Sequence, residues 1–193
     1  YVTVTGTGRN VGGIVGYAYV RVETCANFGE VKAIGDGISC VGGIAGYARV
    51  GYGAEADSAY LLNCYNTGAV TATSTKGVAG GLLGNFRSGT LTNSYTSTLS
   101  EAKSAGSVAG HLEWPSGQKT LNKVYVPASD LETVGNLNGC TIQNGAAESK
   151  TADELRALTA EELGKKFKPD TKNQNGGYPI LEWQDPAAAE SED

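Results

Sequence analysis

The sequence predicts a mainly β protein built from repeats, followed by a small C-terminal unit that mixes helix and strand. Three observations predict it: a glycine-rich block recurs four times, the segments between blocks alternate apolar with β-branched polar residues, and helix-capping signals appear in the last third. Hydrophobic residues make up 40% of the 193 residues, which is enough for a core. The 28 glycines show no Gly-X-Y period, which excludes collagen.

The glycine block repeats with a constant pattern. It occurs as Gly12-Gly13-Ile14-Val15-Gly16, Gly42-Gly43-Ile44-Ala45-Gly46, Gly80-Gly81-Leu82-Leu83-Gly84 and, in degraded form, Gly106-Ser107-Val108-Ala109-Gly110. The spacing between blocks varies, so constant structural faces are joined by loops of changing length. The longest insertion, from about Gly51 to Ser58, is expected to project as a loop.

A second block lies between the glycine blocks. Its copies are Cys25-Ala26-Asn27-Phe28-Gly29, Asn63-Cys64-Tyr65-Asn66-Thr67-Gly68, and the weaker Asn93-Ser94-Tyr95-Thr96 and Asn122-Lys123-Val124-Tyr125. Between the blocks, segments such as Val70-Thr71-Ala72-Thr73 have the alternation of a half-buried strand. The glycine blocks are short apolar strands flanked by residues that allow tight turns and close backbone approach.

Each unit of about 25–40 residues is too small to bury its own apolar face, so the units must stack. Gly-Gly and Thr/Val runs disfavour helical repeats. We therefore predict a β-solenoid, a right-handed parallel β-helix-like stack, over residues 1–127. An antiparallel β-sandwich is the alternative, because the period of a sequence does not determine strand direction.

The last third of the chain differs in composition. Nine basic and seven acidic residues precede position 128, whereas six basic and thirteen acidic residues follow it. We predict a C-terminal cap over residues 128–185 and a linker or disordered tail over 186–193. Since the first glycine block is preceded by only half a unit, we expect the chain to be a piece of a longer repeat array.

Two helix-capping boxes lie in the predicted cap. Thr151 is followed three residues later by Glu154, and Thr159 by Glu162. These predict short helices near 152–167, and a short strand is expected near 178–183. Solenoids need a cap over their last unit, so we expect this segment to cover the apolar end of the stack.

The repeated Gly-Gly-Ile-x-Gly-Tyr-Ala and Asn-Cys-Tyr-Asn-Thr-Gly-x-Val-Thr-Ala patterns resemble the GLUG-motif repeats of bacterial cell-surface proteins, which were named from bacterial IgA-cleaving peptidases among others. The segment from Asn175 to Trp183 is similar to one that closes such regions in surface proteins of gut Gram-positive bacteria. The resemblance implies an extracellular, wall-associated protein whose repeats are non-catalytic spacers or adhesive modules. It carries over no binding residues.

Several classes of chemistry lack their sequence signals. The single histidine, His111, cannot form a His-Glu-x-x-His zinc motif, and its repeat equivalents Tyr17, Tyr47 and Asn85 are not acid–base residues. No Cys-x-x-Cys pair, clustered basic face or run of eighteen apolar residues occurs. We therefore expect no enzyme activity, metal or cofactor, no nucleic-acid partner and no membrane span.

Tyrosine is the candidate binding residue. Alignment of the second block places Ala26, Tyr65, Tyr95 and Tyr125 in one column. Such a column can simply stabilise a sheet through cross-strand contacts. Alternatively it forms an exposed aromatic face for a sugar or a protein, and we then expect Tyr65, Tyr95, Tyr125 and Trp114 to bind.

The cysteines at positions 25, 40, 64 and 140 are interpreted mainly as small core residues. Cys25 and Cys64 share one repeat position, which Ser94 occupies in the next unit. A Cys25–Cys64 bridge stays open in an oxidising exterior.

Together these features predict a non-catalytic extracellular module at the surface of a bacterium, with an adhesive or spacer role. Its partners would be a host or environmental glycan or protein and other modules of the parent protein. The alternatives are a polysaccharide-degrading β-helix enzyme, which needs convergent acids on one face, and a purely structural stalk.

Overall fold

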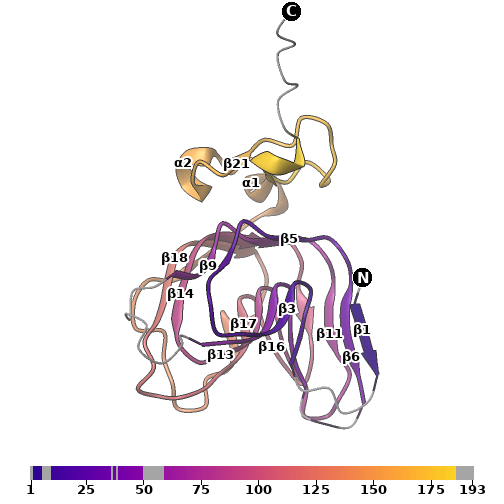
Figure 1. Ribbon diagram of the computed structural model, residues 1–193, viewed down its shortest axis with the longest axis vertical. Coiled ribbons are helices and arrows are strands. Elements are labelled where there is room, and N and C mark those ends of the chain that lie inside the picture. The colour runs from indigo at the N-terminus through magenta and orange to yellow at the C-terminus, as the bar shows by residue number, and fades with distance from the viewer. Residues whose placement is uncertain (1, 6–9, 36, 38, 50–58, 186–193) are drawn as a thin grey trace, which may run out of the picture.

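The protein is mainly β, with mostly parallel sheets that curl around its interior (Figure 1). The computed structural model describes residues 2–5, 10–35, 37, 39–49 and 59–185. The expected loop around 51–58 and the expected tail lie outside the described residues. No helix in the described part of the chain is long and apolar enough to cross a membrane.

Four parallel sheets contain the repeats. Sheet A consists of β1 (Val2–Thr5), β6 (Val31–Ile34), β11 (Val70–Ala72) and β15 (Ser100–Glu101). Sheet B consists of β2 (Asn10–Gly12), β7 (Cys40–Gly42), β12 (Val78–Gly80) and β16 (Ser104–Gly106). Sheet C consists of β3 (Val15–Ala18), β8 (Ala45–Ala48), β13 (Leu83–Phe86), β17 (Ala109–Leu112) and β19 (Val134–Asn136). Sheet D consists of β4 (Val22–Glu23), β5 (Ala26–Asn27), β9 (Ala59–Leu62), β10 (Tyr65–Asn66), β14 (Gly89–Thr96), β18 (Lys119–Pro127) and β20 (Ala147–Lys150).

The chain visits sheets A, B, C and D in that order, and each unit adds one layer of strands beside the previous unit. Gly42 pairs with Gly12 on one side and Gly80 on the other, and Gly80 pairs with Gly106. The block alignment made from the sequence is therefore the register of the parallel sheets.

The glycines of the glycine block, in each of its copies, let sheets B and C approach each other without side chains between them. A Cβ on Gly84 would lie 2.4 Å from the Gly46 carbonyl oxygen and 2.6 Å from the Val41 nitrogen. A Cβ on Gly42 would lie 2.1 Å from the carbonyl oxygen of Ala45. These distances are shorter than any real side chain tolerates, so glycine is required at these positions.

Sheet D bends at the same position in each of the four units that contain a second block. Thr24, Asn63, Asn93 and Lys123 all have a positive φ, between 50° and 56°. Asparagine tolerates this left-handed conformation, and Asn93 also donates a hydrogen bond from Nδ2 to Oδ1 of Asn63 at 3.1 Å. The second block thus begins at a corner.

Beyond the corner, side chains alternate between the two faces of sheet D. Cys64 lies in an apolar core cluster formed by residues of sheets C and D, and a second cluster lies between sheets A and B. Asn66 is buried and accepts a hydrogen bond at Oδ1 from Asn27 Nδ2 at 2.7 Å. Tyr65 points the other way and belongs to a third cluster.

That third cluster joins sheet D to the C-terminal segment. This segment contains α1 (Ala152–Arg156), α2 (Ala160–Leu163), β21 (Phe167–Lys168), β22 (Ile180–Leu181) and a 3-10 turn (Glu182–Gln184), with β21 and β22 antiparallel. Both predicted capping boxes are present. The strand expected near 178–183 is reduced to β22, because the 3-10 turn follows it directly.

Two expectations about this segment are wrong. It does not cover the end of the stack but lies along the outer face of sheet D, seen above β5 and β18 in Figure 1. The parallel sheets also extend past residue 127, because β19 pairs with β17 and β20 with β18. These last strands belong to a unit with no recognisable second block. We call residues 151–185 the clasp.

Candidate binding surface

The tyrosine column of sheet D exists but is covered. Tyr65 pairs with Ala26 on one side and Tyr95 on the other, and Tyr95 pairs with Tyr125, as the alignment predicted. The rings of Tyr65 and Tyr95 stack with centroids 4.9 Å apart. The exposed fractions of Tyr65, Tyr95 and Tyr125 are 0%, 0% and 4%, so the expectation of an exposed column is wrong.

Each hydroxyl of the column bonds to the clasp. Tyr65 donates to Gln184 Oε1 at 2.7 Å. Tyr95 donates to the Pro179 carbonyl oxygen at 2.5 Å and accepts from Asn175 Nδ2 at 2.9 Å. Because burial disfavours the phenolate, the pKa of Tyr95 lies well above its usual value. The column therefore holds the clasp against sheet D instead of meeting a ligand.

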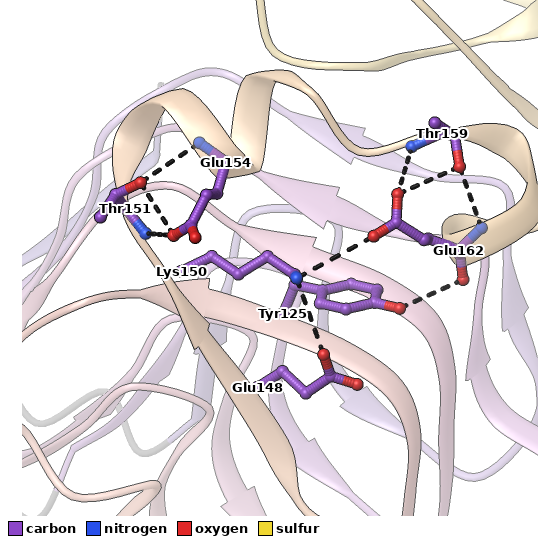
Figure 2. A network of polar contacts seen from close by, with 7 residues as sticks. All are labelled: Tyr125, Glu148, Lys150, Thr151, Glu154, Thr159 and Glu162. Carbon is purple, nitrogen blue, oxygen red and sulfur yellow. Dashed lines mark hydrogen bonds and ion pairs between the residues drawn. The ribbon is translucent and has the colours of Figure 1, made fainter.

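Figure 2 shows the contacts between sheet D and the clasp around Tyr125. The Tyr125 hydroxyl donates to the Glu162 carbonyl oxygen at 3.4 Å, and Lys150 Nζ lies 5.2 Å from the centre of the Tyr125 ring. The Glu162 carboxylate accepts from the Thr159 backbone N–H at 2.9 Å and faces Lys150 Nζ at 3.9 Å. One glutamate thus caps α2 and faces the lysine of β20.

The outer face of sheet C carries two further columns in register. The first is Tyr17, Tyr47, Asn85 and His111, as aligned from the sequence. The second lies two residues later in each unit and consists of Tyr19, Arg49, Arg87 and Glu113. Backbone hydrogen bonds from Arg49 to Ala18, from Arg87 to Ala48 and from Glu113 to Phe86 continue the parallel pairing into it.

The end of these columns nearest the first unit is aromatic. The rings of Tyr17 and Tyr47 stack with centroids 4.3 Å apart, and Tyr19 lies 4.6 Å from Tyr17. The Arg49 guanidinium lies over the Tyr19 ring at 4.4 Å. Tyr17 and Tyr19 are 38% and 48% exposed, which leaves them available to a partner.

The opposite end of the columns is polar. Arg87 Nη1 donates to Glu113 Oε1 at 3.2 Å and to the Tyr47 hydroxyl at 3.3 Å. Asn85 Nδ2 donates to Glu113 Oε2 at 3.0 Å. Trp114 follows Glu113, is 46% exposed, and has the Arg87 guanidinium 5.1 Å from its ring centre. The side chains of one unit are thus oriented by the next.

Burial shifts the pKa values of this region. Loss of contact with water raises the pKa of Tyr17 and of Tyr47, whose phenols are protonated at neutral pH even without this shift. Burial lowers the pKa of His111, which favours the neutral ring. Phenol hydroxyls, a guanidinium, an amide and a carboxylate therefore lie together here. We call Tyr17, Tyr19, Tyr47, Asn85, Arg87, Glu113 and Trp114 the sheet C face.

Of the four expected binding residues, only Trp114 lies in the sheet C face. The sequence aligned the first column, but its residues were not among the expected binding residues, and Tyr19, Arg87 and Glu113 were missed. A signal was available, because the first and third residues after each glycine block share one side of a strand. Among the described residues, no group of three or more His, Cys, Asp or Glu could hold a metal ion.

Comparison with protein-family models and with curated proteins found no match. Among solved structures, the chain is similar to a "putative immunoglobulin A1 protease" from Bacteroides ovatus, with a TM-score of 0.58 and 23% identity. The match covers 94% of this chain and 55% of that chain, so this chain spans about half its length. At this identity the likeness shows a shared fold and leaves activity open.

Proposed function

We propose that the chain is a non-catalytic binding module of a bacterial cell-surface protein, in which GLUG-type units stack as a right-handed β-solenoid. The module lies outside the cell and binds a glycan or a protein through the sheet C face. The parallel, in-register stacking of the units supports the solenoid. The fold shared with a protein from Bacteroides supports a bacterial origin.

The observation that carries the proposal is the composition of the sheet C face. Tyr, Trp and Arg are the residue types that contribute most binding energy at interfaces. Here Tyr17, Tyr19 and Trp114 are exposed, while Tyr47 stacks on Tyr17 and the Arg87 guanidinium lies over Trp114. Because these contacts already orient the side chains, binding requires less ordering than it would in a flexible loop.

The chemistry of the face indicates the kind of partner. Rings at one end offer apolar area with polar tips, and the paired Arg87 and Glu113 offer both donors and acceptors at the other. A surface that is itself both apolar and hydroxyl-rich is complementary to this arrangement. Glycans have that character, and so do protein surfaces rich in Ser, Thr and Tyr.

The experiment is a binding screen of the purified chain against host glycans and extracellular-matrix proteins. Tyr19→Ala combined with Trp114→Ala is expected to weaken binding by about tenfold or more, the loss typical of removing interface hot spots. Leu99→Ala is the matched control, because Leu99 is 46% exposed and lies outside the sheet C face.

Two results would contradict the proposal. Binding by neither the native chain nor the variants would leave the structural stalk as the better description. Cleavage of a polysaccharide or of an immunoglobulin by the purified chain would instead support the enzymatic alternative.

A further inference from the structure

Cys25 and Cys64 occupy equivalent positions in the first two repeat units. Each directly precedes a paired residue of sheet D, because Ala26 pairs with Tyr65 in parallel register. The Tyr65 backbone N–H donates to the Cys25 carbonyl oxygen at 3.0 Å, so the two strands are hydrogen-bonded directly beside the two cysteines. Adjacent strands lie about 4.8 Å apart, within the Cα separation of roughly 4.4–6.8 Å that disulfides span.

Both sulfur atoms are directed toward the same space. Cys64 is in the core cluster between sheets C and D, and Cys25 packs against that cluster. The Cys64 thiol lies 3.5 Å from the carbonyl oxygen of Val22, a residue of the first unit.

The two cysteines differ in access to solvent. Cys64 is fully buried, whereas Cys25 is partly exposed because no described strand lies on the other side of the first unit. A hydrogen bond with Cys64 is the main cause that lowers the pKa of Cys25, to about 7. Cys40 and Cys140 are buried, and burial raises the pKa of Cys40 to about 11.

We propose that Cys25 and Cys64 are a redox pair that closes a reversible disulfide between the first two repeat units, with Cys25 as the attacking thiol and a small-molecule disulfide as the oxidant. The difference in burial assigns the roles, since Cys25 is partly exposed and Cys64 is fully buried. The pair thus provides a covalent link across one interface of the stack.

The disulfide forms in two thiol–disulfide exchange steps. The Cys25 thiolate attacks one sulfur of the oxidant, forms a mixed disulfide and releases the other half as a thiolate. Cys64 then loses its proton and attacks the Cys25 sulfur, which releases the second half. Two electrons pass from the protein to the oxidant, and two protons pass to the released thiolates.

The test is intact-mass measurement of the folded chain after incubation with oxidised glutathione. The native chain is expected to lose about 2 Da, the mass of two hydrogens, and to regain it with dithiothreitol. Cys64→Ser should instead accumulate a glutathione adduct on Cys25, and Cys25→Ser should do neither. Serine fits this column, because Ser94 occupies it in the third unit and its Oγ accepts from the Cys64 backbone N–H at 3.2 Å.

The double variant Cys40→Ser, Cys140→Ser is the matched control, because it leaves only the proposed pair. It should lose the same mass and unfold at a temperature higher by about 5 °C or more when oxidised, since a disulfide restricts the unfolded chain. No mass loss in this variant, or an equal loss in Cys25→Ser, would overturn the proposal. Circular dichroism of each variant establishes that it is folded.

Discussion

At the scale of single residues, the same residue type has opposite roles on two faces. Tyr95 is sealed under the clasp, whereas Tyr19 is about half exposed at the edge of sheet C. Both stand in columns produced by parallel pairing or by the backbone hydrogen bonds that continue it. The columns were predictable because a repeat places equivalent residues one strand spacing apart. Their exposure was not, because it depends on what packs on each face.

The hydroxyl of Tyr95 provides a direct test of its structural role. Tyr95→Phe should lower the free energy of unfolding by about 1–2 kcal/mol, because Pro179 and Asn175 lose a buried hydrogen-bond partner. Urea denaturation followed by tryptophan fluorescence measures this. Tyr125→Phe is the control and should cost less, because its bond to Glu162 is longer at 3.4 Å. Equal and negligible losses would show that these hydroxyls do not hold the clasp.

At the scale of elements, the glycine blocks set the distance between sheets B and C. Gly84 faces the Gly46 carbonyl oxygen and the backbone of Cys40 and Val41, so an added methyl group has no space. The recurrence of glycine was visible in the sequence. That the glycines permit close contact between two sheets, in addition to turning the chain, required the structure.

Gly84→Ala tests this contact. The substitution should lower the free energy of unfolding by about 3 kcal/mol, since a whole sheet must shift to relieve the overlap. The matched control is Gly139→Ala, where a Cβ meets nothing within 4 Å and only the left-handed backbone is strained. That control should cost about 1 kcal/mol. Thermal and chemical denaturation compare the two, and a larger loss at Gly139 would contradict this account of the block.

At the scale of the whole molecule, the clasp connects distant repeat units. Trp183 Nε1 donates to the Thr24 carbonyl oxygen of the first unit at 3.2 Å, and the Lys150–Glu162 pair lies at the last strands. A stack of repeats otherwise has only nearest-neighbour contacts. The clasp therefore adds a contact that spans the units and should make their unfolding more cooperative.

The hold of the clasp should weaken in acid. Hydrogen bonds from the backbone N–H groups of Thr151 and Thr159 lower the pKa values of Glu154 and Glu162 below the usual value of a glutamate. A carboxylate with a lowered folded pKa stabilises the fold above its unfolded pKa, and this stability is lost as pH falls through the folded value. The denaturant concentration at the midpoint of unfolding should therefore decrease as the pH is lowered from about 5 to about 3.

Glu162→Gln is the variant that tests this dependence, because glutamine retains the shape of the cap without the titration. Its midpoint should vary less with pH over the same range than that of the native chain. Asp130→Asn is the control, since Asp130 lies outside the clasp. It should leave the pH dependence of the denaturation midpoint unchanged. If the midpoint of Glu162→Gln varied with pH as steeply as that of the native chain, Glu162 would not be the source of the acid sensitivity.

The sequence by itself determined the repeat alignment and, through it, the register of every column from the first unit to the fourth. It also determined the starts of both short helices, because a capping box is satisfied within four residues. These features are local or follow from translation of one unit along the stack.

Only the tertiary structure decided the direction of the strands, the extension of the sheets through β19 and β20, and the docking of the clasp on sheet D. Parallel pairing and docking depend on contacts between residues far apart in the chain, such as Tyr95 with Pro179. The repeat pattern of the sequence does not predict these contacts, because a buried and an exposed tyrosine column have the same pattern. The physical difference is the apolar surface that the clasp brings to one face and not to the other.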